Sequence, residues 1–137
     1  MFTAIDISTS ALVAQRARLD AIAGNIANSS TTRNERGELE PYKARHVTFQ
    51  ADNRVSTAGG GVGVRVSSVE ISDNPPLQRY DPGHPDADPE TGFVSTPNID
   101  QVTQQVDALA AARAYEANIG VIEITRDLGA QTLRIIA

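Results

Sequence analysis

The segment from residue 80 to residue 88 holds the residue types most able to do chemistry. It contains three aspartates and one histidine, Asp81, His84, Asp86 and Asp88. Carboxylates and an imidazole this close together can bind a divalent cation, as a small metal-dependent enzyme would require. The spacing does not match an EF-hand, no glutamate closes the loop, and prolines stiffen it. We therefore favour a rigid, solvated turn and keep the metal-binding enzyme as the alternative.

Other patterns of catalysis or ligand binding are weak. The glycines of residues 59–63 resemble a phosphate-binding loop, but a strand-like run follows them and no Gly-Lys-Ser/Thr motif occurs. Nucleophilic catalysis needs a base beside the nucleophile, and neither His46 nor His84 lies near such a motif. The chain has no cysteine, which excludes disulfides and thiolate metal sites. We therefore expect no catalysis, no metal and no cofactor.

The composition excludes further classes of protein. A length of 137 residues corresponds to about one domain. The net charge is −5 and the twelve basic residues are scattered among seventeen acidic ones, whereas a nucleic-acid-binding protein normally has a basic patch. No apolar run is long enough to span a membrane, and no signal-peptide pattern is visible. Aromatic residues make up only 4% of the chain, so we expect much of its apolar surface to meet other chains.

Two helices are predicted at the ends of the chain. Residues 1–30 predict the first, because apolar residues recur every seven positions, as in a coiled-coil seam. These residues are Ile5, Leu12, Leu19 and Ile26, and Ile22 widens the stripe. Residues 97–137 predict a longer helix, with Asn98 and Gln101 as a reciprocal cap at its start. Its apolar residues, which include Leu109, Val121, Ile124 and Leu128, occupy more than one side, so this helix needs several neighbours.

The middle of the chain, residues 31–96, predicts a small module of strands and loops. It holds most of the prolines and glycines, and apolar and polar residues alternate at residues 47–49, 62–66 and 69–71. Such alternation is typical of short, half-buried strands. The predicted fold class is therefore mainly α with a small β insert.

Polar residues in the predicted helices form a second group of candidates. Asn25 and Asn28 lie in the first helix, and Arg113, Tyr115 and Asn118 lie in the last. Asparagine is a poor helix former, and arginine and tyrosine are enriched at interfaces. Polar residues within a seam specify register and partner. We predict such a role for these five residues, the alternative being that they only face water.

The two Asn-containing segments resemble the signatures of bacterial flagellar rod and hook proteins. The first is Asn25-Ile26-Ala27-Asn28, and the second is Arg113-Ala114-Tyr115-Glu116-Ala117-Asn118-Ile119. The middle of the chain is similar to the proximal rod family of the FlgC type. The segments that carry this similarity are Tyr42-Lys43-Ala44-Arg45 and Tyr80-Asp81-Pro82-Gly83-His84-Pro85. The short length also fits that family, because hook and distal-rod proteins are much longer.

The resemblance implies a structural subunit of the proximal rod of the flagellar basal body. In such a rod the two terminal helices pair as a coiled-coil unit, and many units form a tube that transmits torque and lets exported subunits pass. The implied partners are other proximal and distal rod subunits, the adaptor at the rod base and the type III export apparatus. The implied location is the periplasm, reached without a cleaved signal peptide. The rival interpretation is another axial rod subunit of the same superfamily.

The prediction assigns subunit contacts to both helices. On the first helix they are Ile5, Leu12, Leu19, Ile22, Asn25, Ile26 and Asn28. On the last helix they are Leu109, Arg113, Tyr115, Asn118, Val121, Ile124 and Leu128.

Overall fold

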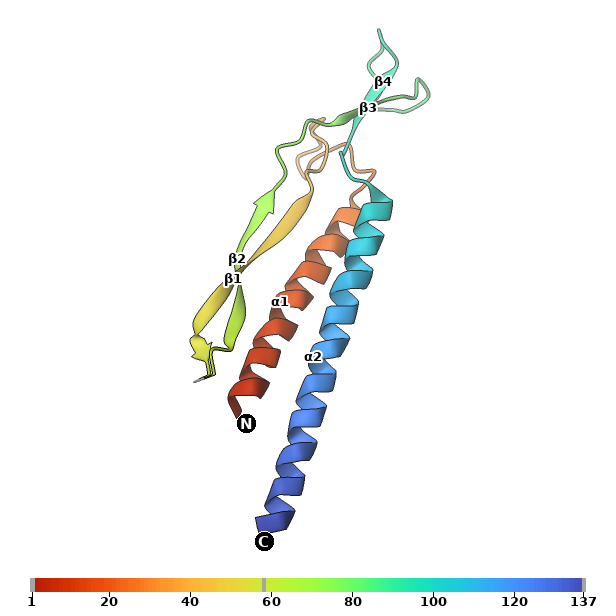
Figure 1. The fold of residues 1–137 in the computed structure, drawn as a ribbon. Helices are drawn as coiled ribbons and strands as arrows, with labels where there is room; N and C mark the ends of the chain where they lie inside the picture. Colours follow the sequence, from red (N-terminus) through yellow and green to blue (C-terminus); the bar gives the residue numbers. More distant parts are fainter. Residues whose placement is uncertain (1, 58, 137) are drawn as a thin grey trace.

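The computed structural model describes the backbone of residues 2–57 and 59–136, and the side chains of residues 4–57 and 59–135. Figure 1 shows an elongated molecule in which two long antiparallel helices lie side by side. In chain order the elements are α1 (Phe2–Ala27), β1 (Arg45–Ser56), β2 (Val62–Ile71), β3 (Leu77–Tyr80), β4 (Phe93–Thr96) and α2 (Gln101–Ile136). This architecture confirms the predicted fold class, mainly α with a small β insert.

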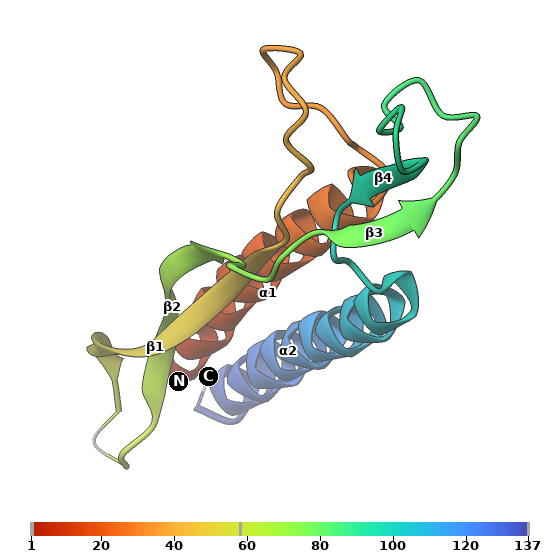
Figure 2. The ribbon, with the colours of Figure 1, turned by 90° about the horizontal axis from the view of Figure 1, so that it is seen from above.

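The helix α1 lies in the middle of the structure. It packs against α2 on one side and against the β1–β2 hairpin on the other (Figures 1 and 2). Ser10 attaches the hairpin to α1, because its Oγ accepts a hydrogen bond of 3.0 Å from the backbone N–H of Val64. A Cβ on Gly63 would lie 3.1 Å from the Ser10 Oγ and 2.9 Å from the Val55 Cβ. Glycine at this position therefore permits the close approach of hairpin and helix.

The β-strands form two separate antiparallel sheets of two strands each. Strands β1 and β2 pair from Arg45↔Ile71 to Ser56↔Val62, with irregularities after Thr48 and after Asp52. The two short runs predicted at residues 62–66 and 69–71 are parts of the single strand β2. Strands β3 and β4 pair beyond the end of the helix pair, as Figure 1 shows.

The start of α2 differs from the prediction. Asp100 caps the helix, because its Oδ1 accepts a hydrogen bond from the N–H of Val102 and its Oδ2 accepts one from Thr103 Oγ1. The predicted reciprocal cap by Asn98 and Gln101 is wrong. Asn98 Nδ2 donates instead to the carbonyl of Pro75 at 3.2 Å. A turn between Pro97 and Ile99 leaves Asp100 as the last residue before the helix, the position from which a side chain reaches the free N–H groups.

The core is small. Its buried apolar side chains are Ala14, Ile22, Ala44, Val94 and Ala111, and its buried polar residues are Ser8, Asn25 and Gln104. The low aromatic content of the chain is consistent with so small a core.

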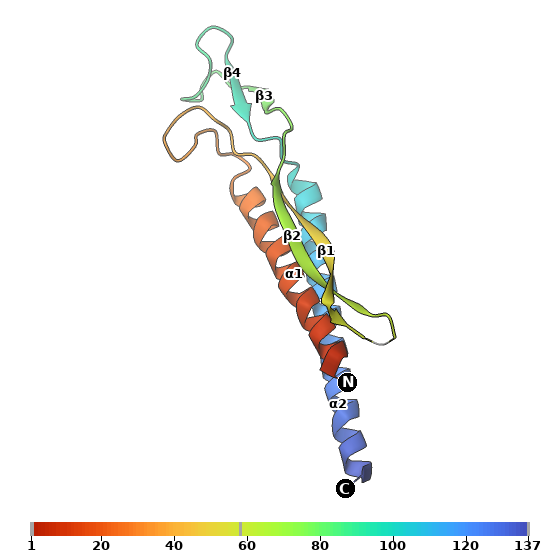
Figure 3. The same cartoon turned by 90° about the vertical axis from the view of Figure 1, so that its left-hand side faces the viewer.

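The helix α2 is longer than its partner within the chain. It has 36 residues, against 26 in α1, which corresponds to about 54 Å and about 39 Å. Its C-terminal turns extend past the N-terminal end of α1 (Figures 1 and 3). Neither helix in the described part of the chain is long and apolar enough to cross a membrane.

Candidate assembly surface

The face of α2 that meets α1 has a strict seven-residue repeat made mostly of small or polar residues. Its two rows are Gln104, Ala111, Asn118 and Thr125, and Ala108, Tyr115, Ile122 and Gly129. All eight residues are buried or half-buried. A seven-residue repeat keeps one seam in contact with a neighbouring helix. This face is therefore the contact within the chain, and Ile122 is its only large aliphatic residue.

The opposite face of α2 carries large apolar residues that the rest of the chain leaves uncovered. We call these residues the outer stripe: Val102, Val106, Leu109, Val121, Ile124, Leu128 and Ile135. Between 46% and 85% of the surface of each is exposed. Scattered exposed apolar residues are common on proteins, but seven large ones on one side of a helix mark a surface for another molecule.

The outer stripe contains two spacings: Val102 and Leu109 are seven residues apart, as are Val121, Leu128 and Ile135, and a second set of positions is eleven apart. Val102, Ile124 and Ile135 belong to a repeat of eleven residues, and Arg113 occupies the remaining position of that repeat. Eleven residues per three turns is close to the natural period of an α-helix, so such a stripe runs nearly straight along the helix.

The structure divides the predicted contact residues of the last helix between these two faces. Leu109, Val121, Ile124 and Leu128 belong to the outer stripe, and the exposed Arg113 lies among them. Tyr115 and Asn118 lie on the face toward α1 and are half-buried. Asn118 Nδ2 donates to the carbonyl of Ala114 in its own helix at 2.7 Å.

On α1 the predicted apolar contact residues remain partly accessible. Four of them, Ile5, Leu12, Leu19 and Ile26, are half-buried and share one side of the helix. Ile22 is buried within the chain. Asn28, which follows the last residue of α1, is half-buried, and its Nδ2 donates to the carbonyl of Gly24 at 2.9 Å. The half-buried row is the second surface of the helix pair that a neighbour can reach.

Asn25 is fully buried where α1, α2 and β1 meet. Its Nδ2 donates to the carbonyl of Arg45 and to Gln104 Oε1, both at 2.9 Å. Its Oδ1 accepts from the N–H of Arg45 at 2.8 Å and from the hydroxyl of Tyr42 at 3.4 Å. The spacing of residues in the sequence marked Asn25 as unusual. No pattern in the sequence indicated that Asn25 would bind Gln104 and Arg45, which are 79 and 20 residues away along the chain.

Other polar contacts between the helices are weaker. Arg18 of α1 and Asp107 of α2 form a salt bridge of 3.3 Å, and both side chains are partly exposed. An exposed ion pair of this kind contributes at most about 1 kcal/mol. Gln15 Oε1 is buried and has no hydrogen-bond partner among the described residues. The seam between α1 and α2 is therefore held mainly by apolar packing, which includes the buried Ile22, and by Asn25, with an exposed bond of 2.7 Å from Gln101 Nε2 to Ser29 Oγ at its end.

The segment 80–88 forms a structured turn between β3 and β4. Tyr80 packs edge-to-face on Phe93, with ring centroids 5.4 Å apart. Asp86 connects this turn to the loop after α1, because it accepts hydrogen bonds from Arg33 Nε at 2.7 Å and Thr32 Oγ1 at 2.6 Å. The hydrogen bonds from Arg33 and then Thr32 hold the pKa of the Asp86 carboxyl below its usual value. We call this contact the Asp86 clasp.

The alternative of a metal site at this turn is not supported by the geometry. Asp86 is engaged in the clasp, and His84 Nδ1 accepts a hydrogen bond of 3.0 Å from the N–H of Asp86. Asp88 accepts from the N–H of Glu90 at 3.0 Å and from Thr91 Oγ1 at 2.7 Å. Within residues 4–57 and 59–135, no three histidine, aspartate or glutamate side chains converge on a common point. Local hydrogen bonds thus occupy the carboxylates of Asp86 and Asp88 and the Nδ1 of His84.

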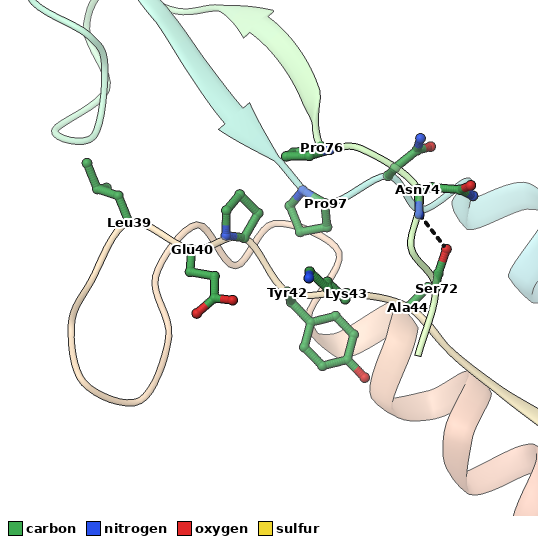
Figure 4. A pocket seen from close by; sticks show the side chains of 11 residues that line it. Leu39, Glu40, Tyr42, Lys43, Ala44, Ser72, Asn74, Pro76 and Pro97 are labelled. Carbon is green, nitrogen blue, oxygen red and sulfur yellow. Dashed lines mark hydrogen bonds between the residues drawn. The ribbon is translucent and has the colours of Figure 1, made fainter. Parts of the chain in front are cut away.

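A hollow of about 250 Å³ lies where the loop after α1, the end of β2 and the start of α2 come together. Figure 4 shows Leu39 and Glu40 on the loop side of this hollow, and Pro76 and Pro97 on the other. The Oγ of Ser72 accepts a hydrogen bond of 3.3 Å from the N–H of Asn74 (Figure 4). Glu40 and Lys43 also line the hollow, but among the described residues neither side chain is hydrogen-bonded to this hydroxyl, so no base is positioned to activate it.

Comparison with known proteins gives consistent matches. The family model described as "Flagella basal body rod protein" matches residues 5–33. The chain is 36% identical to the flagellar basal-body rod protein FlgC of Borreliella burgdorferi, over 99% of this chain and 97% of that protein. It is 36% identical to FlgC of Bacillus subtilis, over 98% and 97%. It is 40% identical to FlgC of Salmonella typhimurium, over 95% and 93%.

Proposed function

Since the chain belongs to the family of FlgC-type flagellar basal-body rod proteins, we propose that it is a structural subunit of the rod that assembles through the outer stripe of α2. The role of rod subunit follows from the family, whose members match the chain along nearly its whole length. The outer stripe is the observation that carries the mode of assembly. Seven large apolar residues in one row face solvent in the single chain, and burying them against neighbours would be strongly favourable.

The half-buried row on α1 supplies a second contact in this proposal. Ile5, Leu12, Leu19 and Ile26 share one side of α1 and keep part of their surface exposed. A subunit with two different contact surfaces binds its neighbours heterologously, and such contacts generate rings or open helical assemblies. The proposed assembly is a tube whose walls are the helix pairs of successive subunits.

The finer placement of the subunit comes from the family and from the segment 80–88. We place it in the proximal rod, in the periplasm, where the tube transmits torque and leaves a channel for exported subunits. Its proposed partners are other proximal and distal rod subunits, the adaptor at the rod base and the type III export apparatus, which would deliver it without a cleaved signal peptide. Similarity to FlgC proteins over almost the full length favours this placement over another axial rod subunit.

The proposed role is mechanical and includes no catalysis. The relatives are rod proteins by name, and the aspartates and histidine between residues 80 and 88 take part in local hydrogen bonds. Torque would pass between subunits through packed helix faces.

The test is a substitution in the outer stripe that leaves the single chain folded. Leu109→Asp places a carboxylate in the stripe, and its matched control, Gln105→Asp, places one a turn earlier at an exposed position outside the stripe. Both sites are exposed, so each change costs the free chain less than about 1 kcal/mol. In a strain without its own copy of the gene, we expect Gln105→Asp to restore motility and intact rods, and Leu109→Asp to restore neither. Normal swimming of the Leu109→Asp strain would show that the stripe is not the assembly surface.

A further inference from the structure

We propose that Asn25 is the positioning residue that sets the axial register of α2 and β1 against α1. It would thereby fix the position of the outer stripe along the helix axis relative to the β1–β2 hairpin. The inference rests on the proposed function in one respect only, namely that this axial position matters for assembly. The register itself is a property of the free chain and can be measured there.

The first argument is that the amide of Asn25 is completely used. Both of its N–H groups donate, one to the carbonyl of Arg45 and one to Gln104 Oε1. Its oxygen accepts from the N–H of Arg45 and from the hydroxyl of Tyr42. An amide offers two donors and two acceptor directions, so no hydrogen-bonding capacity is left over. One side chain in the last turn of α1 thus contacts a loop, a strand and the second helix.

The second argument is that the contact with Arg45 imitates a strand. Asn25 binds both the N–H and the C=O of one residue, as an opposing residue does in an antiparallel ladder. Arg45 is the first residue of β1, and its partner across the hairpin is Ile71. The Asn25 amide therefore occupies the open edge of β1 at the point where the hairpin begins, and this fixes the hairpin along α1.

The third argument is that the other polar contacts that could position α2 along α1 are exposed, including the bond of 2.7 Å from Gln101 Nε2 to Ser29 Oγ. The inner face of α2 consists mostly of alanine, glycine and polar residues, which do not interlock as large side chains would. The Arg18–Asp107 salt bridge is partly exposed and thus weak. A single buried polar contact in a helix seam is a known way to specify register. The bond between Asn25 and Gln104 is the fully buried polar contact between these helices.

A change of register would act directly on the assembly surface. If α2 slipped by one turn along α1, the outer stripe would move by about 5.4 Å relative to the hairpin. Neighbours that contact both the stripe and the hairpin would then no longer fit. Asn25 would therefore control assembly without touching a neighbour, since it is buried within its own chain.

The test measures the register in the free, full-length chain. The chain has no cysteine, so spin labels can be attached to Val13→Cys on α1 and Asp127→Cys on α2, both at exposed positions. In the otherwise unaltered chain we expect a single narrow distribution of the label-to-label distance. With Asn25→Ala we expect a second population displaced by about one helical turn, ~5 Å, while the helix content measured by circular dichroism is retained.

Two matched controls separate positioning from general stability. Asn28→Ala removes the other asparagine of the same segment, which bonds to its own helix, and should leave the distance distribution unchanged. Gln104→Glu keeps an oxygen that accepts from Asn25, and its charge lies in the first turn of α2, where the helix dipole favours it. This variant should also keep the single distance, whereas Gln104→Ala should produce the second population.

Hydrogen exchange of the Arg45 amide gives an independent readout. Its protection should be lost with Asn25→Ala and retained with Gln104→Ala, because only the first change removes the acceptor of that N–H. The proposal is refuted if Asn25→Ala keeps the single distance, or if it simply lowers the helix content. It is equally refuted if Asn28→Ala shifts the distance as much. Failure of the Leu109→Asp experiment would leave this measurement unaffected.

Discussion

Replacing a single alanine on the inner face of α2 should weaken the packing between the two helices. Ala111 is fully buried, with 0% of its surface exposed, and lies on the face of α2 toward α1. Ala111→Leu adds three carbon atoms to a side chain that is already fully buried. Overpacking of this kind costs about 1–3 kcal/mol, because neighbouring side chains and the backbone must move. The free energy of unfolding of the chain should fall by that amount.

The matched control is the same substitution one residue earlier. Ala110 is exposed on α2, and alanine and leucine are both good helix formers, so Ala110→Leu should change stability by less than about 0.5 kcal/mol. The two variants have the same composition and differ only in the face that carries the leucine. Any difference between them therefore reports packing against α1.

Urea unfolding followed by circular dichroism measures the effect. With a denaturant slope of about 2 kcal/mol per molar, the midpoint of Ala111→Leu should lie roughly 0.5–1.5 M below that of Ala110→Leu. Equal midpoints for the two variants, or a higher one for Ala111→Leu, would mean that the helices do not meet at Ala111. The assignment of the inner and outer faces of α2 would then be wrong.

Two further predictions concern carboxylates outside the helices. Asp86→Asn weakens the Asp86 clasp, so trypsin should cleave after Arg33 faster than it does in the parent chain. The control Asp81→Asn should leave the rate of cleavage unchanged. Equal rates for all three chains would contradict a role of the clasp in holding this loop. Hydrogen bonding from Arg54 lowers the pKa of Asp52 to about 2, below its unfolded value of about 3.9. This contact therefore stabilises the chain fully above about pH 4 and less as the pH falls toward 2. An NMR titration of the Asp52 carboxyl should show a midpoint near 2 that rises toward 4 in Arg54→Gln, and a midpoint near 4 in the parent chain would contradict it.

Much of the secondary structure could be predicted because its signals are local. The seven-residue apolar repeat from Ile5 to Ile26 indicated the first helix, and the apolar residues between Leu109 and Leu128 indicated the second. The cap of α2 was misassigned because aspartate and asparagine both cap helices well. A turn in the backbone decided between Asp100 and Asn98, and no residue pattern announced that turn.

The partners of the polar candidates could not be predicted from spacing. Asn25 was recognised as unusual within a helix, but it binds Gln104 and Arg45, which are far from it along the chain. The sequence made Asp86 a candidate metal ligand, whereas in the fold its carboxylate accepts a hydrogen bond from Arg33, which is 53 residues away. In each case the chemistry of the side chain was evident from its type, and its role depended on which distant group the fold brought near.

By itself the sequence determined that two helices carry apolar stripes. It also determined that the chain has too few large side chains to build an extensive hydrophobic core of its own. Only the tertiary structure decided which residues of each helix pack within the chain and which apolar residues stay exposed. The inner face of α2 is made of residues such as Ala111, while the larger Leu109 and Ile124 face solvent. The physical reason is that a periodic row of apolar residues indicates a surface that becomes buried from water, and the chain that buries it can be the same chain or another one. Folding the single chain separates the two cases, because the apolar residues that remain exposed are those available to neighbouring subunits.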